Sequence, residues 1–145
     1  SGLYRIEILM AGRPTGAKDW ESLAFEEYRK RLRGTIELDA RYHRTGDALE
    51  RALAKSTQPV LCLDPRGEAC DSLAFSRLLF DRLDTGSSRL CLAVGPAEGF
   101  SDDVRRDRQL LSLSKLTFPH QLVKVLLAEQ IYRANEIRRG SDYHK

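Results

Sequence analysis

Three short runs of almost entirely apolar residues constrain the fold more than any other feature of this sequence. They lie at residues 60–63, 89–95 and 110–114, and each is long enough for one strand. A strand without polar alternation is typical of a parallel sheet that helices cover on both faces. Helical patterns separate the three runs along the chain. This alternation predicts an α/β fold with a mainly parallel sheet and flanking helices.

The N-terminal half continues the alternation of strands and helices. Residues 4–10 are expected to form a strand, and residues 35–42 alternate apolar with polar side chains, which predicts a half-buried strand near a sheet edge. Helices are expected to start near Asp19, Asp47 and Asp71. The inward-facing residues of these helices are predicted to be Trp20, Leu23, Ala24, Tyr28, Leu32, Ala48, Leu49, Ala52, Leu53, Leu73, Leu78, Leu79 and Leu83.

A long helical pattern covers residues 121–139 and stops at Gly140. Its apolar positions are spread over more than one face, so this helix is predicted to be buried on two sides. In a chain of this length, a second copy of the same chain is the simplest partner for the second side. We therefore expect a homodimer.

Composition is typical of a soluble globular protein, with 41% hydrophobic and 31% charged residues. No linker or repeat is visible, so residues 1–145 are expected to form a single domain, and Ser1 and Gly2 look like a cloning remnant. No apolar run approaches the length of a membrane span, and no signal peptide is visible. These features predict a cytoplasmic protein, or an organellar one if a targeting sequence has been removed.

The cysteines, histidines and basic residues indicate which kinds of binding site this chain can contain. The three cysteines form no Cys-x-x-Cys pair and the three histidines lie far apart, which predicts reduced cysteines and no metal site. The net charge is only +3, but basic residues gather in residues 29–33 and in the last third of the chain. This distribution fits either a phosphate-facing side or an ordinary solvated surface.

Five motifs follow one another in the second half of the chain. They are LDPRG at 63–67, VGPAEG at 94–99, SKLTFPH at 114–120, EQIYR at 129–133 and the tail DYH at 142–144. In this order they resemble the RlmH family, SPOUT-superfamily methyltransferases that act on a pseudouridine in large-subunit ribosomal RNA. The resemblance implies a SPOUT fold with a C-terminal trefoil knot, in which the last helix threads through an earlier loop.

The resemblance also implies S-adenosyl-L-methionine as the methyl donor, bound by three loops at strand ends. The implied cofactor-binding residues are Leu63, Gly95, Leu113, Ser114, Lys115, Leu116, Thr117 and Phe118. Their chemistry suits this role, because adenine needs an apolar slot and a glycine lets the backbone approach a ligand closely. Plain turn chemistry is the alternative interpretation of each glycine.

The acceptor in the RlmH family is N3 of pseudouridine, whose proton must leave. His144 is the candidate general base by residue type, and Tyr143 can stack on the base or bind it by a hydrogen bond. Arg133 is a candidate for stabilising the negative charge that develops. His120 and Lys124 are candidates for contacting the substrate.

Structural roles are the alternative for each of these residues. Arg133 can pair with Glu129 or Glu136 on the same helix, His120 suits a helix start, and the tail can be disordered.

Three departures from the family pattern bear on the site. Pro96 stands at a position that is usually glycine, Lys124 stands at a position that is usually arginine, and residues 42–58 form a shorter segment than usual. A proline loses an amide donor, and a lysine loses bidentate phosphate binding. We therefore keep two alternatives beside the RlmH-like activity, namely a non-catalytic ribosome- or RNA-binding relative and a SPOUT methyltransferase with another RNA target such as tRNA.

Overall fold

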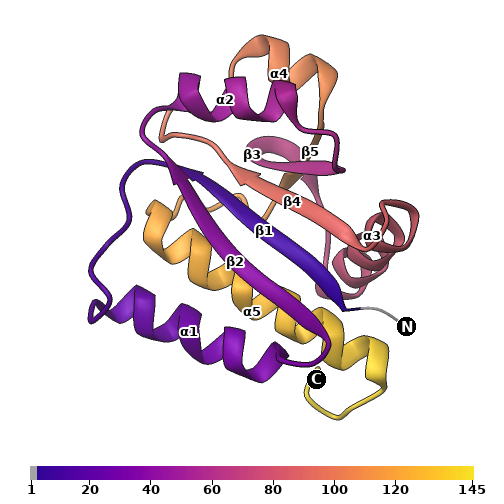
Figure 1. Cartoon of the computed structure of the whole chain (residues 1–145). Helices are drawn as coiled ribbons and strands as arrows, with labels where there is room; N and C mark the ends of the chain where they lie inside the picture. Colours follow the sequence, from indigo (N-terminus) through magenta and orange to yellow (C-terminus); the bar gives the residue numbers. More distant parts are fainter. Residues whose placement is uncertain (1–2) are drawn as a thin grey trace.

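Strands and helices alternate along residues 3–145, the part of the chain that this computed structural model describes (Figure 1). The strands are β1 (Tyr4–Ala11), β2 (Ile36–His43), β3 (Val60–Ala69), β4 (Arg89–Val94) and β5 (Gln109–Ser112). The helices are α1 (Trp20–Leu32), α2 (Gly46–Lys55), α3 (Ser72–Thr85), α4 (Asp102–Asp107) and α5 (His120–Arg139). The prediction for Ser1 and Gly2 lies outside the described residues.

The strands form one sheet in the order β2-β1-β4-β3-β5, and all neighbouring strands run parallel. The α/β fold with a parallel sheet is therefore confirmed. β2, whose sequence alternates apolar and polar residues, is an edge strand as predicted, and β5 is the opposite edge.

Helices cover both faces of the sheet (Figure 1). Helices α1, α3 and α5 lie on one face, where Ile6, Ile8 and Met10 of β1 join the larger apolar core. Helices α2 and α4 lie on the other face, where Leu9 and Ala11 of the same strand join a second apolar cluster. Because successive side chains of β1 enter different clusters, the sheet is buried on both faces.

Helix α5 lies between α1 and α3 on the sheet (Figure 1). On the α3 side, the hydroxyl of Ser76 donates a hydrogen bond to the carbonyl oxygen of Ala134 at 3.0 Å. On the α1 side, the rings of Tyr28 and Tyr132 meet with their centroids 6.0 Å apart. The chain itself thus supplies much of the burial that the wide apolar pattern of α5 predicted, and the homodimer stays a prediction.

The ends of α5 lie close to their predicted positions. The helix begins at His120, directly after Pro119 and one residue earlier than predicted. It ends at Arg139, and Gly140 adopts a left-handed conformation (φ 74°) in which its N–H donates to the carbonyl of Ile137 at 3.0 Å. Among the helices that the structure describes, none is long and apolar enough to cross a membrane.

The predicted inward faces of α1 and α3 were wrong at three positions. Trp20 and Leu23 are 59% and 58% exposed, and Leu73 is 44% exposed. Helix α1 instead turns Phe25 toward the core, which leaves Trp20 and Leu23 on its outer side. The buried face of α3 begins at Phe75, so Leu73 is left outside.

β3 continues beyond residues 60–63, where the sequence predicted a strand ending in a turn. Leu63 pairs with Leu111 of β5, and after a shift in register Glu68 pairs with the same Leu111. Residues 64–67 therefore bulge out between two paired segments of one strand. The last four residues of the LDPRG motif form the bulge, and β5 pairs with β3 on both sides of it.

Gly67 makes this arrangement possible, because a Cβ atom there would lie 2.6 Å from the backbone nitrogen and carbonyl carbon of Leu111. No side chain fits at that distance, so the two backbones meet only at a glycine. The trefoil knot stays a prediction. The pairing of β5 with both halves of β3, and the closure of the bulge against Leu111, are consistent with it.

We expect Gly67→Ala to lower the free energy of unfolding by about 3 kcal/mol, since the new methyl group must push one backbone away from the other. Urea denaturation measures this loss. The matched control is Gly16→Ala, where the nearest atom would be the Asp19 carboxylate at an ordinary 3.5 Å. Equal stabilities for the two variants would contradict the close approach of β3 and β5.

Candidate active site

The segments that follow β3, β4 and β5 meet at one edge of the sheet. β3 pairs with β4 on one side and with β5 on the other, so the carboxyl ends of the three strands are neighbours. Between these segments and the start of α5 lies a cavity of about 570 Å³, a volume typical of small-molecule sites. In open α/β sheets, ligands bind at this edge. We call this cavity the strand-end cavity.

The strand-end cavity brings together residues from all three predicted loops. The predicted cofactor residues that line it are Leu63, Gly95, Leu113, Ser114, Leu116, Thr117 and Phe118, and His120 lines it as well. Lys115 is exposed and lies outside the lining. Gly99 also lines the cavity, as do Asp64 and Ala97, which had no predicted role.

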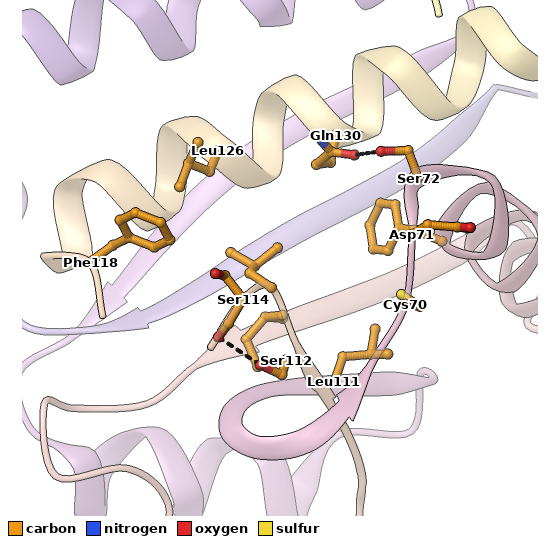
Figure 2. A pocket seen from close by; sticks show the side chains of 12 residues that line it. Cys70, Asp71, Ser72, Leu111, Ser112, Ser114, Phe118, Leu126 and Gln130 are labelled. Carbon is orange, nitrogen blue, oxygen red and sulfur yellow. Dashed lines mark hydrogen bonds between the residues drawn. The ribbon is translucent and has the colours of Figure 1, made fainter. Parts of the chain in front are cut away.

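A second cavity of about 360 Å³ adjoins the first and shares five residues with it, Leu63, Ser112, Leu113, Ser114 and Phe118. Figure 2 shows its lining, which comes from the start of α3, the end of β5, the loop that follows β5 and the middle of α5. The loop between the two cavities is held by its own serine, because Ser114 accepts the N–H of Leu116 on its Oγ at 3.0 Å. Its carbonyl oxygen also accepts the hydroxyl of Ser112 at 2.9 Å (Figure 2).

Asp64 ties two of the cavity loops together. Its carboxylate is completely buried and accepts the N–H of Arg66 at 2.9 Å and the N–H of Phe100 at 3.3 Å. Arg105 of α4 donates to the same carboxylate from Nε at 3.1 Å. The segment after β3 is therefore fixed to the segment after β4 by one buried charge.

The pKa of Asp64 reflects these contacts. Burial alone would raise the pKa of the carboxyl group, since it disfavours the charged form. The hydrogen bonds from Arg66, Arg105 and Phe100, together with the positive charge of Arg105, outweigh burial and hold the pKa below its ordinary value. Asp64 is therefore ionised at neutral pH, and in this charge state it holds the two loops together.

The turn after β4 is compact although it contains Pro96. The N–H of Gly99, which has a positive φ of 86°, donates to the carbonyl of Pro96 at 2.8 Å. Gly95 is buried, and a Cβ atom on it would lie 3.2 Å from the ring of Phe100. The proline therefore stands at the first position of a closed turn, between the strand end and the cavity wall.

The C-terminal tail folds back onto α5. Arg133 forms an ion pair with Glu129 at 3.1 Å, and the hydroxyl of Tyr143 donates to Glu129 at 2.9 Å. The ring of Tyr143 meets Tyr132 edge to face with centroids 4.8 Å apart, and Arg133 also contacts His144. We call Glu129, Arg133, Tyr143 and His144 the tail cluster.

Two details of the tail cluster limit its proton chemistry. Nη1 of Arg133 lies 3.0 Å from Nδ1 of His144, and a guanidinium can only donate, so Nδ1 accepts and the neutral ring carries its proton on Nε2. Burial, followed by the hydrogen bond to Glu129, raises the pKa of Tyr143 to about 12. Tyr143 thus keeps its proton at neutral pH and donates it to Glu129.

The tail cluster and the strand-end cavity lie at different places along α5. His120 at the start of the helix lines the cavity, while Arg133 follows 13 residues later, about 20 Å along the helix axis. Within one subunit, the predicted cofactor residues are brought together and the predicted catalytic residues are brought together, but the two groups are kept apart.

Lys124 has partners inside the fold. It is only 5% exposed, its Nζ donates to the hydroxyl of Tyr42 at 2.7 Å, and it lies 5.2 Å from the centre of the Phe25 ring. Its predicted contact with substrate stays a prediction, as does that of His120. Among the residues that the structure describes, no group of three or more His, Cys, Asp or Glu is arranged to hold a metal ion.

Comparison with protein families decides the class of this chain. The family model described as "Predicted SPOUT methyltransferase" matches residues 4–144. The chain belongs to this family. It is thus a methyltransferase by family, and the parallel α/β sheet is the fold expected from the resemblance.

Relatives called "Ribosomal RNA large subunit methyltransferase H" are similar to this SPOUT chain, two of those described here over nearly its whole length. The one from Protochlamydia amoebophila is 36% identical over 143 residues, 99% of this chain and 100% of the relative. The one from Prochlorococcus marinus is 38% identical over 147 residues, 97% and 96% of the two chains. A third, from Rhizobium meliloti, is 48% identical over 98 residues, 67% and 61%. The resemblance to the RlmH family is therefore confirmed.

We expect Asp64→Asn to lower the free energy of unfolding of this SPOUT methyltransferase by about 2–3 kcal/mol at pH 7, because the amide removes the charge that faces Arg105 and replaces one acceptor with a donor. The pKa of Asp64 is held low in the folded state, so its stabilisation is present above about pH 4 and is lost as the pH falls through the folded pKa. The stabilities of the two proteins should therefore converge below about pH 4.

Urea titrations from pH 7 to pH 3 measure this difference. The matched control is Asp102→Asn, which removes an equal charge from the exposed carboxylate 3.9 Å from the same Arg105. That variant should remain close to the wild type at every pH. A difference in the free energy of unfolding between wild type and Asp64→Asn that stays constant from pH 7 to pH 3 would refute stabilisation by the ionised Asp64 carboxylate.

Proposed function

We propose that this chain transfers a methyl group from S-adenosyl-L-methionine to N3 of a pseudouridine in large-subunit ribosomal RNA, and that it does so as a homodimer. The observation that carries the proposal is the convergence of the LDPRG, VGPAEG and SKLTFPH loops on one cavity in a member of the SPOUT family. The names of the relatives support ribosomal RNA of the large subunit as the substrate.

The cavity residues fit this methyl donor. A space of about 570 Å³ suits a ligand of its size, and Leu63, Leu113 and Phe118 offer apolar surface for the adenine ring. Gly95, which is buried and has no side chain, lets a ligand approach the backbone. When bound, the donor supplies a methyl group on a positively charged sulfur, and the chain's own residues must align the acceptor with it and exclude water.

The tail cluster supplies donors to the acceptor base. With Nδ1 occupied by Arg133, His144 offers Nε2–H, which can stabilise the anion left when N3 of the pseudouridine loses its proton. Glu129 holds Arg133 and Tyr143 in place, and its charge balances that of Arg133. The geometry thus favours His144 as a stabilising donor over the general base that residue type alone suggested.

The separation of these two groups supports the homodimer. Arg133 follows Val123, the last residue of α5 that lines the strand-end cavity, by about 15 Å along the helix axis, so a second copy of the chain is a simple source of a tail that reaches this cavity. Three exposed apolar side chains offer surface for such a contact, namely Trp20 and Leu23 of α1 and Leu116 beside the cavity, which is 72% exposed.

Substrate and donor are tested together on purified protein. Large ribosomal subunits that lack the modification are incubated with the chain and S-adenosyl-L-methionine, and their nucleosides are then analysed by mass spectrometry. We expect N3-methylpseudouridine to appear. A methyl mark in tRNA alone favours another RNA target, while RNA binding with no calorimetric heat from the donor favours a non-catalytic relative.

We expect His144→Ala to lower the rate of methyl transfer by about a hundredfold while the affinity for the methyl donor stays within about twofold, because the tail cluster lies away from the cavity. His144→Gln separates the two roles of the ring. Its amide N–H can replace the Nε2–H donor but cannot accept a proton at neutral pH. A rate for His144→Gln well above that of His144→Ala supports the donor role, and equal losses would support a base.

Mixing two inactive variants tests the shared site. His144→Ala lacks the tail donor, and Thr117→Trp places a large ring in the lining of the cavity. After the mixed subunits re-equilibrate, half of the dimers contain both variants, and each has one intact site, so about a quarter of the wild-type activity should return. If the tail serves the cavity of its own subunit, the mixture stays inactive. Sedimentation should give twice the subunit mass of 16.5 kDa.

A further inference from the structure

Helix α2 contacts the turn after β4 at its first residue. A Cβ atom on Gly46 would lie 2.8 Å from Cγ and 3.2 Å from Cδ of Pro96, closer than side chains approach one another. Gly46 starts the helix, and Thr45 caps it by accepting the N–H of Ala48 at 3.1 Å. The glycine at position 46 therefore leaves the space that the proline ring occupies.

The same helix holds the far end of this turn. The carboxylate of Glu50 accepts both the N–H of Ser101 at 2.8 Å and its hydroxyl at 2.6 Å. Between the two contacts, Phe100 is buried in one apolar cluster with Leu49 and Leu53 of α2. Successive turns of α2 thus contact the start, the middle and the end of residues 96–101.

Gly95, Pro96, Ala97 and Gly99 form one wall of the strand-end cavity, so their position sets its shape. Asp64 fixes this wall from the β3 side, through Phe100 and Arg105. On the opposite side, the contacts of the wall come from α2. A change in the first turn of α2 should therefore reach the cavity through Pro96 without any contact between α2 and a ligand.

We propose that α2 is a brace for the donor-binding turn, and that Gly46 and Glu50 are positioning residues for the methyl donor. Gly46 and Pro96 form a matched pair, in which the small residue on the helix permits the ring on the turn. This inference rests on the proposed use of the strand-end cavity for S-adenosyl-L-methionine. It assigns a role to the segment between β2 and β3, which none of the five motifs contains.

The matched pair is tested by a double-mutant cycle with G46A, P96G and the double variant. In the wild-type background, the new methyl group on residue 46 must displace the Pro96 ring, so we expect the dissociation constant of S-adenosyl-L-methionine to rise about tenfold. In the P96G background the ring is gone, and the same substitution should change the dissociation constant by less than about twofold. Isothermal calorimetry measures all four proteins.

A purely structural effect is excluded by the stability of the same variants. Alanine is a better helix residue than glycine, so G46A should not melt α2, and in the P96G background it should leave the protein as stable or more stable. In enzyme assays, the loss should appear in the KM for the donor with kcat nearly unchanged, since the tail cluster is untouched. A loss of affinity by G46A that persists in the P96G background would overturn the pairing.

Hydrogen exchange separates this inference from the proposed function. The N–H of Gly99 reports on the turn directly, because it donates to the carbonyl of Pro96. In the free protein, G46A should speed its exchange, and the effect should be smaller in the P96G background. If the wild type binds no donor, the proposed function fails. The exchange rates alone then show whether α2 holds the turn in place. Equal exchange in wild type and G46A would overturn it.

Glu50 is tested by E50Q, in which one acceptor oxygen facing Ser101 becomes a donor. We expect a several-fold weaker affinity for the donor. E98Q is the matched control, because Glu98 is an exposed carboxylate of the same turn and its loss removes an equal charge from the neighbourhood of the cationic ligand. Equal losses of donor affinity in E50Q and E98Q would show that Glu50 acts only through its charge, and would overturn its positioning role.

Discussion

The contact between the backbones of Gly67 and Leu111 is the constraint on which the site depends. It allows β5 to pair with β3 on both sides of the bulge, and this pairing places the start of the β5–α5 loop beside the turn after β3. Since β4 pairs with the opposite side of β3, all three loops then end at one place. A larger side chain at position 67 would separate the strands and open the cavity, so the shape of the site is a consequence of chain packing in the sheet.

Neighbouring loops still need to be held in register, and a buried charge does this. Asp64 binds its own bulge through Arg66 and the next loop through Phe100 and Arg105. A buried carboxylate is costly unless it is fully paired, so the arrangement is stable only when both loops are in place. The wall formed by the β4 turn is then fixed between Asp64 on one side and α2 on the other, which gives a cavity that is formed before any ligand binds.

Local sequence patterns predicted the strands and helices well, but they predicted poorly which residues contact each other in the folded chain. The unbroken apolar runs give the parallel sheet, because only burial on both faces explains them, and the alternation in β2 gives its edge position. The outward position of Trp20 escaped the helical pattern, because several apolar stripes fit α1 and only packing against α5 selects the one with Phe25. The role of Asp64 was also missed, since its partner Arg105 lies 41 residues away and no local pattern joins them.

The tail cluster is a different case. The sequence predicted functional roles for Arg133, Tyr143 and His144, and the structure adds the contacts that join them to Glu129 and to one another. α5 is 20 residues long, and the tail that follows it turns back only as far as Glu129. A straight helix cannot shorten the distance between its own start and its last turns. A charged and aromatic cluster is therefore ordered toward the end of this helix, while the strand-end cavity lies at its start.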